Sequence, residues 1–226
     1  ICADCDREKI ENLKKCIMPI YEPGLESIIK RCADKKLLKF TTETSEAVQF
    51  SDAVFICVGT PEMDDGSADI SQILNVSREI AQNLNGYKLI INKSTVPAGT
   101  CRRIKAEVGN MLGRLDEESE FDIVSNPEFL REGRAVEDFI RPERIIIGVE
   151  SARAEEMMRR IYHKQIQLGI PFISTGFETS EMIKYASNAF LASKISFINE
   201  IANMCERCGA DIKIVSKAMG MDSRIG

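Results

Sequence analysis

The sequence predicts an α/β fold in which a doubly wound parallel sheet is followed by a long connecting helix. Along residues 1–176, short apolar runs alternate with amphipathic runs of helical period. The run Ala53–Val58 is apolar throughout, as expected for a strand that helices cover on both faces of a parallel sheet. A long helical pattern from Glu178 to Cys208 then follows, which is typical of a helix that bridges two domains or packs in a dimer.

Each element is assigned from its apolar period and from the residues that bound it. We expect strands at Ile1–Ala3, Leu38–Thr41, Ala53–Val58, Lys88–Asn92, Phe121–Ser125, Arg144–Val149 and Pro171–Ser174. We expect helices at Arg7–Cys16, Pro23–Lys35, Glu43–Phe50, Ile70–Leu84, Gly99–Leu112, Ala152–Tyr162, Glu178–Cys208 and Ile212–Met219, with a variable loop over Gly109–Glu120. The expected domains are 1–176, a Rossmann-type domain, and 177–226, the long helix with a central dimerisation region.

Composition narrows the classes of function. The chain has 226 residues, of which 44% are hydrophobic and 29% are charged, and its formal net charge is -5. This is the profile of a soluble globular protein, and without a basic patch nucleic acid is not an expected partner. No apolar run reaches membrane-spanning length, so no membrane association is expected. Eight scattered cysteines favour reduced thiols in the cytoplasm.

Neither the cysteines nor the histidine predicts a reactive centre. Cys2/Cys5 and Cys205/Cys208 have the spacing of zinc ligands. The first pair would point to opposite faces of a strand and the second lies in a helical pattern, so no metal site is expected. The one histidine, His163, lies in a charged helical context. Acid/base chemistry would therefore fall to carboxylates, lysines or water.

Polar turns follow the predicted strands, where ligands bind in doubly wound folds. They are Asp4, Gly59-Thr60-Pro61, Lys93-Ser94-Thr95-Val96-Pro97 and Asn126-Pro127-Glu128. An acid after the second strand of a dinucleotide fold can bind the adenosine ribose and disfavour a 2'-phosphate, which would select NAD over NADP. Asp4 is placed for that role, although a helix cap before Arg7 is the simpler alternative.

Two further pairs are candidates for chemistry. If the chain turns helical after Pro127, Glu128 and Glu132 share one helix face, where two acids resist joint ionisation. The alternative is a helix N-terminus, where acids are favoured by the dipole alone. Lys184 and Asn188 are also four apart, so they share one helix face. They lie in a mostly uncharged stretch, which makes a functional role plausible, and the alternative interpretation is a pair of solvated surface residues.

A Rossmann-type fold needs a preceding strand and a glycine-rich phosphate turn, and this sequence contains no GxGxxG. We therefore expect the chain to be a fragment in which the first strand is missing.

Several motifs in this order resemble the UDP-glucose 6-dehydrogenase family, within the nucleotide-sugar dehydrogenases. They are Pro19–Leu25, Val58–Pro61, Lys93–Thr100, Ser125–Gly133, Arg141–Gly148, Glu181–Asn188 and Asp222–Gly226. The resemblance extends over essentially the whole chain. It implies that NAD is the cofactor and that the C6 alcohol of UDP-glucose is oxidised twice, to UDP-glucuronate. The family's cysteine nucleophile, which carries thiohemiacetal and thioester intermediates, is expected after Gly226 and is assigned to no residue here, so the chain alone should be inactive.

The resemblance also implies roles for individual residues. Glu128 would handle protons in thioester hydrolysis, Thr95 would bind cofactor and place water, and Lys184 with Asn188 would stabilise oxyanions. The implied cofactor-binding residues are Asp4, Lys9, Val58, Gly59, Thr60, Pro61, Glu62, Ser94, Thr95, Val96 and Glu132. The implied substrate-binding residues are Glu128, Phe129, Leu130, Arg131, Glu132, Lys184, Asn188 and Arg224, the last of which would reach a neighbouring subunit.

The expected partners are a nucleotide sugar and a second copy of the chain, joined through the long helix. Two alternatives remain open. One is a sister enzyme that oxidises GDP-mannose or a UDP-N-acetyl-hexosamine. The other is a non-catalytic dimerisation module, which would have no need of Thr95, Glu128, Lys184 and Asn188.

Overall fold

The computed structural model describes residues 1–113 and 121–225, so part of the loop expected over Gly109–Glu120, and Gly226, lie outside the described residues. The strands are β1 (Cys2–Ala3), β2 (Phe40–Thr41), β3 (Ala53–Ile56), β4 (Lys88–Asn92), β5 (Phe121–Ser125), β6 (Ile145–Gly148) and β7 (Phe172–Thr175). The helices are α1 (Arg7–Lys14), α2 (Leu25–Asp34), α3 (Thr44–Phe50), α4 (Ser71–Gln82), α5 (Thr100–Leu112), α6 (Ala135–Ile140), α7 (Ala152–Ile161), α8 (His163–Gln167), α9 (Phe177–Cys208) and α10 (Ile212–Met219).

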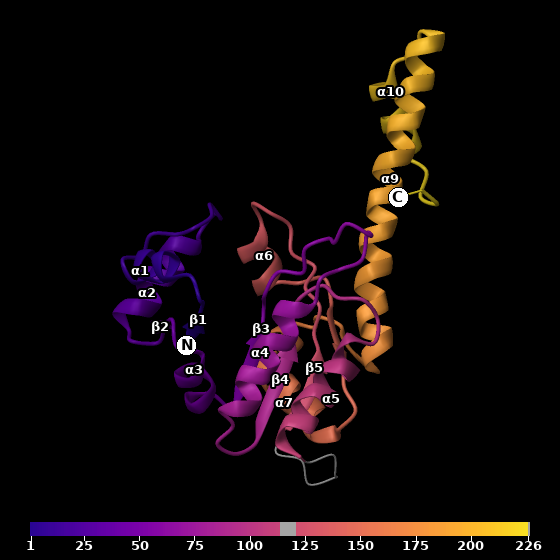
Figure 1. Cartoon of the computed structure of the whole chain (residues 1–226). Helices are drawn as coiled ribbons and strands as arrows, with labels where there is room; N and C mark the ends of the chain where they lie inside the picture. The colour runs from indigo at the N-terminus through magenta and orange to yellow at the C-terminus, as the bar shows by residue number, and fades with distance from the viewer. Residues whose placement is uncertain (114–120, 226) are drawn as a thin grey trace. The chain divides into compact units, whose positions relative to one another are not determined.

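A five-stranded sheet in the order β3-β4-β5-β6-β7 forms the centre of the first part of the chain (Figure 1). Strand β4 is buried at every residue and pairs in parallel with β3 and with β5. Because side chains alternate along a strand, Ile90 faces one side of the sheet while Leu89 and Ile91 face the other. The doubly wound α/β architecture expected from the sequence is therefore confirmed.

Helices cover both faces of this sheet. On one face, Ile90 and Ile123 pack in a cluster with residues of α4 and α5, such as Ile73 and Ile104. On the other face, Leu89, Ile91 and Val124 cluster with residues of β6 and α7. This two-sided burial is the reason why β4 reads as a continuous apolar run in the sequence.

The sheet is not parallel throughout. Strands β5 and β6 are antiparallel and pair through only Ser125 and Gly148, whereas β6 and β7 are parallel to each other over four residues. Apolar periodicity reports burial but not strand direction, so the sequence could not reveal this reversal.

Strands β1 and β2 form a separate two-stranded parallel sheet. Both residues of β1, Cys2 and Ala3, are exposed, and Phe55 on β3 is 39% exposed. Helix α1 follows β1 with Asp6 as its N-cap, whose side chain accepts the N–H of Lys9 at 2.9 Å. The expected alternation of strand and helix therefore holds in this region too.

Residues 126–134 contain no helix, so the conditional prediction that Glu128 and Glu132 share a helix face is wrong. The Glu128 carboxylate accepts the N–H of Leu130 at 2.5 Å, which satisfies that donor in a local turn instead. Gly133 has a φ of +78°, which also interrupts a right-handed helix. The helix that follows is α6, which the sequence analysis did not predict.

The described chain divides into two compact units, Ile1–Lys184 and Tyr185–Gly226, and helix α9 contributes to both. The second unit contains the rest of α9 and α10, whose N-cap Asp211 accepts the N–H groups of Lys213 and Ile214. Among the described residues, no helix is both long enough and apolar enough to cross a membrane. The domain boundary expected after residue 176 stays a prediction.

Candidate active site

Two turns at the carboxyl ends of β3 and β4 are tied together by side-chain hydrogen bonds. The Thr60 hydroxyl donates to the backbone carbonyl of Thr95 at 2.8 Å, and the Ser94 hydroxyl donates to the carbonyl of Val58 at 2.6 Å. Val96, next in the second turn, is buried in the core. The structure thus brings together two sequence-predicted cofactor segments that lie about 35 residues apart in the chain.

A buried ion pair lies at the end of β5. The Lys184 ammonium donates to Glu128 Oε1 at 2.9 Å, and Lys184 is 6% exposed. A buried ammonium needs a nearby counter-charge, and the Glu128 carboxylate supplies it. Two residues that the sequence analysis named for catalysis, 56 positions apart, are therefore in direct contact.

The position of Lys184 depends on contacts made earlier in α9. Glu181, 2% exposed, accepts the N–H of Gly99 at 2.6 Å and that of Cys101 at 2.8 Å, at the start of α5. The hydroxyl of Ser125 on β5 donates to Ser180 at 3.0 Å. Sequence reasoning missed Glu181, although an acid in a mostly apolar helical stretch was a usable signal.

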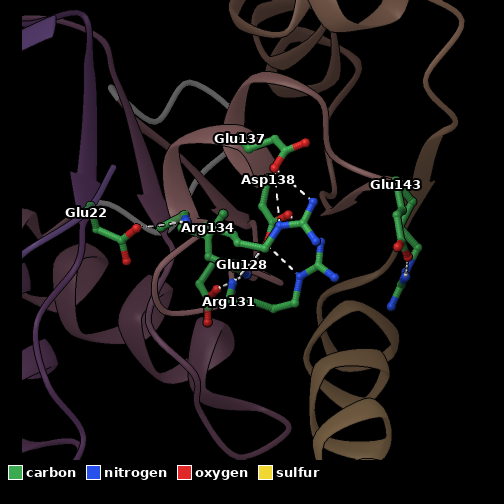
Figure 2. Close-up of polar contacts among 10 residues, drawn as sticks. Glu22, Glu128, Arg131, Arg134, Glu137, Asp138 and Glu143 are labelled. Atoms are coloured by element: carbon green, nitrogen blue, oxygen red, sulfur yellow. Dashed lines mark hydrogen bonds and ion pairs between the residues drawn. The ribbon is translucent and has the colours of Figure 1, made fainter. Parts of the chain in front are cut away.

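The segment Glu128–Arg134 forms a loop that begins at this ion pair, and Figure 2 shows polar contacts of this loop. The ring of Phe129 lies 4.3 Å from the Arg144 guanidinium carbon and 5.2 Å from the Lys184 ammonium, so two cations contact it. Leu130 is 38% exposed and Glu132 is exposed, so both side chains are accessible to a ligand.

Arg131, predicted to bind substrate, is bound to Asp138 on α6. Its guanidinium donates to both carboxylate oxygens at 2.9 and 2.6 Å, and its backbone N–H donates at 3.0 Å. These hydrogen bonds lower the pKa of Asp138 to about 2 and raise the pKa of Arg131. In this structure the Arg131 side chain therefore fixes its own loop.

Asp4 and Lys9, the predicted ribose contacts, form an ion pair with 2.6 Å between Nζ and Oδ2. Partial burial opposes ionisation of Asp4, but hydrogen bonds from Lys9 and from the N–H of Asp6 hold the pKa of Asp4 below its usual value. The simpler alternative, that Asp4 caps α1, is wrong because Asp6 is the N-cap. An ionised, half-exposed carboxylate after β1 is what binding of ribose hydroxyls requires.

These groups fit a dinucleotide. The donor and acceptor set consists of an ionised acid beside a lysine after β1 and of two joined polar turns after β3 and β4. The remaining predicted cofactor residues Gly59, Pro61 and Glu62 are exposed next to these turns. No steric obstacle lies at Gly59, where an added Cβ would meet nothing within 4 Å.

Two predicted site residues belong to the second unit. Asn188 is exposed on α9, and Arg224 is exposed and pairs with Asp222, with 2.6 Å between Nη2 and Oδ2. Their roles in catalysis and in substrate binding stay predictions.

Polar residues that the sequence analysis left without a role support the carboxyl ends of the strands. Asn126 donates to the carbonyl of Ile146 at 2.9 Å and accepts from the buried Tyr162 hydroxyl at 2.6 Å. Burial raises the pKa of Tyr162 to about 12, so it stays a hydrogen-bond donor. Burial also lowers the pKa of Lys93, which follows β4. Within the described residues, no three His, Cys, Asp or Glu side chains are grouped as metal ligands.

A doubly wound sheet with an acid after β1 and joined polar turns at the strand ends is typical of dinucleotide-binding domains. Residues 1–166 match the NAD-binding domain of the UDP-glucose/GDP-mannose dehydrogenase family, and residues 178–226 match the central domain of that family. The chain belongs to this family of oxidoreductases, and its cofactor is NAD. The resemblance found in the sequence motifs is therefore confirmed.

Similar proteins support the assignment over the whole chain. The UDP-glucose 6-dehydrogenase TuaD of Bacillus subtilis is 45% identical over all of this chain and 48% of its own length. The UDP-glucose 6-dehydrogenase of Rhizobium meliloti is 47% identical over all of this chain and 52% of its own length. The chain thus spans about half the length of the curated relatives it matches.

Solved structures agree on the fold. A UDP-glucose dehydrogenase from Pyrobaculum islandicum superposes with a TM-score of 0.91 at 38% identity, over 99% of this chain and 51% of that one. A GDP-mannose dehydrogenase from Pseudomonas aeruginosa also gives 0.91, at 32% identity, over 97% of this chain and 50% of that one. Backbone similarity alone therefore does not separate the two substrate branches.

Proposed function

We propose that the full-length protein containing this chain oxidises UDP-glucose to UDP-glucuronate in two NAD-dependent steps. The balanced reaction converts the sugar C6 alcohol, two NAD⁺ and one water into a carboxylate, two NADH and three protons. The observation that carries this proposal is the Glu128–Lys184 pair, 2.9 Å apart, at the end of β5 and near the joined cofactor turns. Identities of 45% and 47% to enzymes named for UDP-glucose support that substrate.

Glu128 is the proposed acid and base. Its side chain is 30% exposed, so a substrate hydroxyl or a water molecule can reach it, while Lys184 is nearly closed to solvent. A carboxylate paired with an ammonium can accept the proton that leaves the C6 hydroxyl, or a proton from the water that attacks in the hydrolytic step. Its other oxygen accepts the N–H of Leu130, which orients the group.

Lys184 is the proposed electrostatic stabiliser. When Glu128 takes up a proton, the neighbouring ammonium loses its counter-charge and becomes available to a negatively charged oxygen on the reacting carbon. Its position in α9, fixed by Glu181 and Ser180, keeps it in place without reorganisation. Thr95 and Asn188 are proposed to complete the site.

The cofactor would be held by Asp4 and Lys9 at the adenosine ribose and by the turns Val58–Glu62 and Ser94–Val96. NAD, when bound, supplies the hydride acceptor for each of the two oxidations. Glu132 is proposed to border the nicotinamide, and the half-buried Phe129 with the exposed Leu130 and Arg131 is proposed to contact the sugar nucleotide.

The test counts NADH formed per sugar consumed by the full-length protein, with UDP-glucose, GDP-mannose and UDP-N-acetylglucosamine. Two NADH per UDP-glucose is the expected result. Glu128→Gln should lower kcat about 10²–10⁴-fold, because general acid–base catalysis contributes that much. Glu156→Gln, an exposed acid on α7, is the matched control. Two NADH per molecule of another sugar would move the protein to a sister branch, and no turnover would favour the non-catalytic module.

We also propose that the protein forms a homodimer through α9. In the second unit this helix exposes large apolar side chains, among them Phe190 at 65%, Ile195 at 63% and Met204 at 60%. Exposed apolar residues in such number are typical of a surface that a partner covers. Phe190→Asp should shift the mass measured by light scattering from dimer to monomer, with helix content unchanged by circular dichroism. A monomeric wild type would contradict the proposal.

A further inference from the structure

Glu22 is a buried acid with no part in the site described above. It lies between α1 and α2, in the motif Pro19–Leu25, and is 9% exposed, whereas its neighbour Tyr21 is 88% exposed. A carboxylate is rarely buried unless it is paired or hydrogen-bonded. The hydrogen-bond partners of the Glu22 carboxylate therefore indicate the structural role of the motif Pro19–Leu25.

Both oxygens of Glu22 accept hydrogen bonds from the backbone of one distant segment. Oε1 accepts the N–H of Gly133 at 2.8 Å, and Oε2 accepts the N–H of Ala135 at 3.1 Å. These donors lie more than a hundred positions further along the chain, where the loop Glu128–Arg134 passes into α6. Figure 2 shows the Glu22 side chain directed at this backbone.

The loop thus has an anchor at each end and one in the middle. Glu128 is bound to Lys184 at the start, and Arg131 is bound to Asp138 in the middle. The side chains from Leu130 to Arg134 are exposed, so packing of those side chains contributes little to the loop path. Backbone contacts such as those of Glu22 then determine where the exposed side chains point.

We infer that Glu22 is a positioning residue, which holds the loop Glu128–Arg134 in the form that binds the sugar nucleotide. The inference rests on the proposed function for the ligand it names. The contact comes from the same segment of chain that begins with Asp4 and Lys9, so it ties the substrate loop to the adenosine side of the cofactor site. Glu22 acts through the loop backbone and touches no reacting atom.

The first test is steady-state kinetics of the full-length protein with Glu22→Gln. The glutamine keeps one acceptor oxygen but presents an NH₂ group to the second backbone N–H, and it removes the negative charge. We expect the KM for UDP-glucose to rise about tenfold, the effect of losing one charge-assisted hydrogen bond. The KM for NAD and kcat should change less than about threefold. Glu26→Gln, an exposed acid paired with Lys30 in the next turn, should change nothing.

An equal rise in both KM values, or an unchanged KM for the sugar nucleotide, would show that Glu22 only stabilises the fold and would overturn the inference. The second test needs no activity. Hydrogen exchange at single-residue resolution should show the amides of Gly133 and Ala135 protected in the wild type, and at least one of them should exchange faster in Glu22→Gln. Rapid exchange in the wild type would refute the anchor even if the variant failed to fold. Protection without turnover of any sugar would leave the anchor intact and reject only the proposed function.

Discussion

Replacing Gly148 with alanine should destabilise the first unit by overpacking. Gly148 ends β6 and lies against the start of α9. A Cβ at this position would be 2.8 Å from the carbonyl oxygen of Gly176, 2.8 Å from Cβ of Ser180 and 2.9 Å from Cα of Phe177. Two of these three atoms belong to the backbone, so no side-chain rotation relieves the clash. The start of α9 has to move away from the sheet.

An added methyl group in a well-packed site costs roughly 1–3 kcal/mol, and the backbone contacts place this substitution near the upper value, at about 3 kcal/mol. For a chain of this size, that corresponds to a fall in Tm of about 5–10 °C. The assay is urea unfolding of the chain followed by circular dichroism. Gly176→Ala is the control, since an added Cβ there meets nothing within 4 Å. Equal stabilities of the two variants would refute the reasoning.

Three other predictions concern charged groups. Glu181→Ala should cost about 3 kcal/mol in urea unfolding, because the backbone N–H groups of Gly99 and Cys101 lose a charged acceptor. Glu178→Ala, which removes a solvent-screened ion pair with Arg102, should cost much less, and equal losses would contradict this. The pKa of Asp138 in the folded chain is about 2, below the usual 3.8. Its contribution to the free energy of unfolding is therefore fully present above pH 4 and is lost as the pH falls towards 2. The stability difference between wild type and Asp138→Asn, measured by unfolding, should therefore shrink over that range, and a constant difference would disprove it. In the full-length protein, Asp4→Asn should lower the preference for NAD over NADP by about tenfold in kcat/KM, and an unchanged ratio would remove Asp4 from the ribose site.

The fold was largely predictable because its core strands are buried on both faces. Strand β4 and helix α4 were located to within two residues, since burial leaves a clear apolar period. The antiparallel direction of β6 relative to β5 was not predictable, because the direction of a strand depends on the connection that precedes it and not on the residues of the strand itself. Helix α6 was missed because it is only six residues long, which is too short to show a clear apolar period.

Sequence motifs named two residues that are in contact in the structure, but their catalytic roles stay predictions, and contacts that link distant segments through backbone donors were missed. Glu128 and Lys184 were identified by motif, and the structure places them together. The roles of Glu22 and Glu181 were not visible in the sequence, since each accepts hydrogen bonds from backbone N–H groups at least 80 residues away. Backbone donors carry no sequence signature, so only a structure reveals such partners.

The junction between β5 and β6 has a thermal consequence. One residue pair joins the two strands, while Val124, Ile147, Met158 and their neighbours pack across the same boundary. Besides the two hydrogen bonds of Asn126 with Ile146 and Tyr162, the βαβ segment formed by β6, α7, α8 and β7 is attached by apolar contact, which weakens on cooling. Strands β3, β4 and β5 are instead joined by full hydrogen-bonded ladders. Near 0 °C, this segment should be the first part of the sheet to separate, so cold storage would selectively loosen the strand end at Gly148 against which the start of α9 packs.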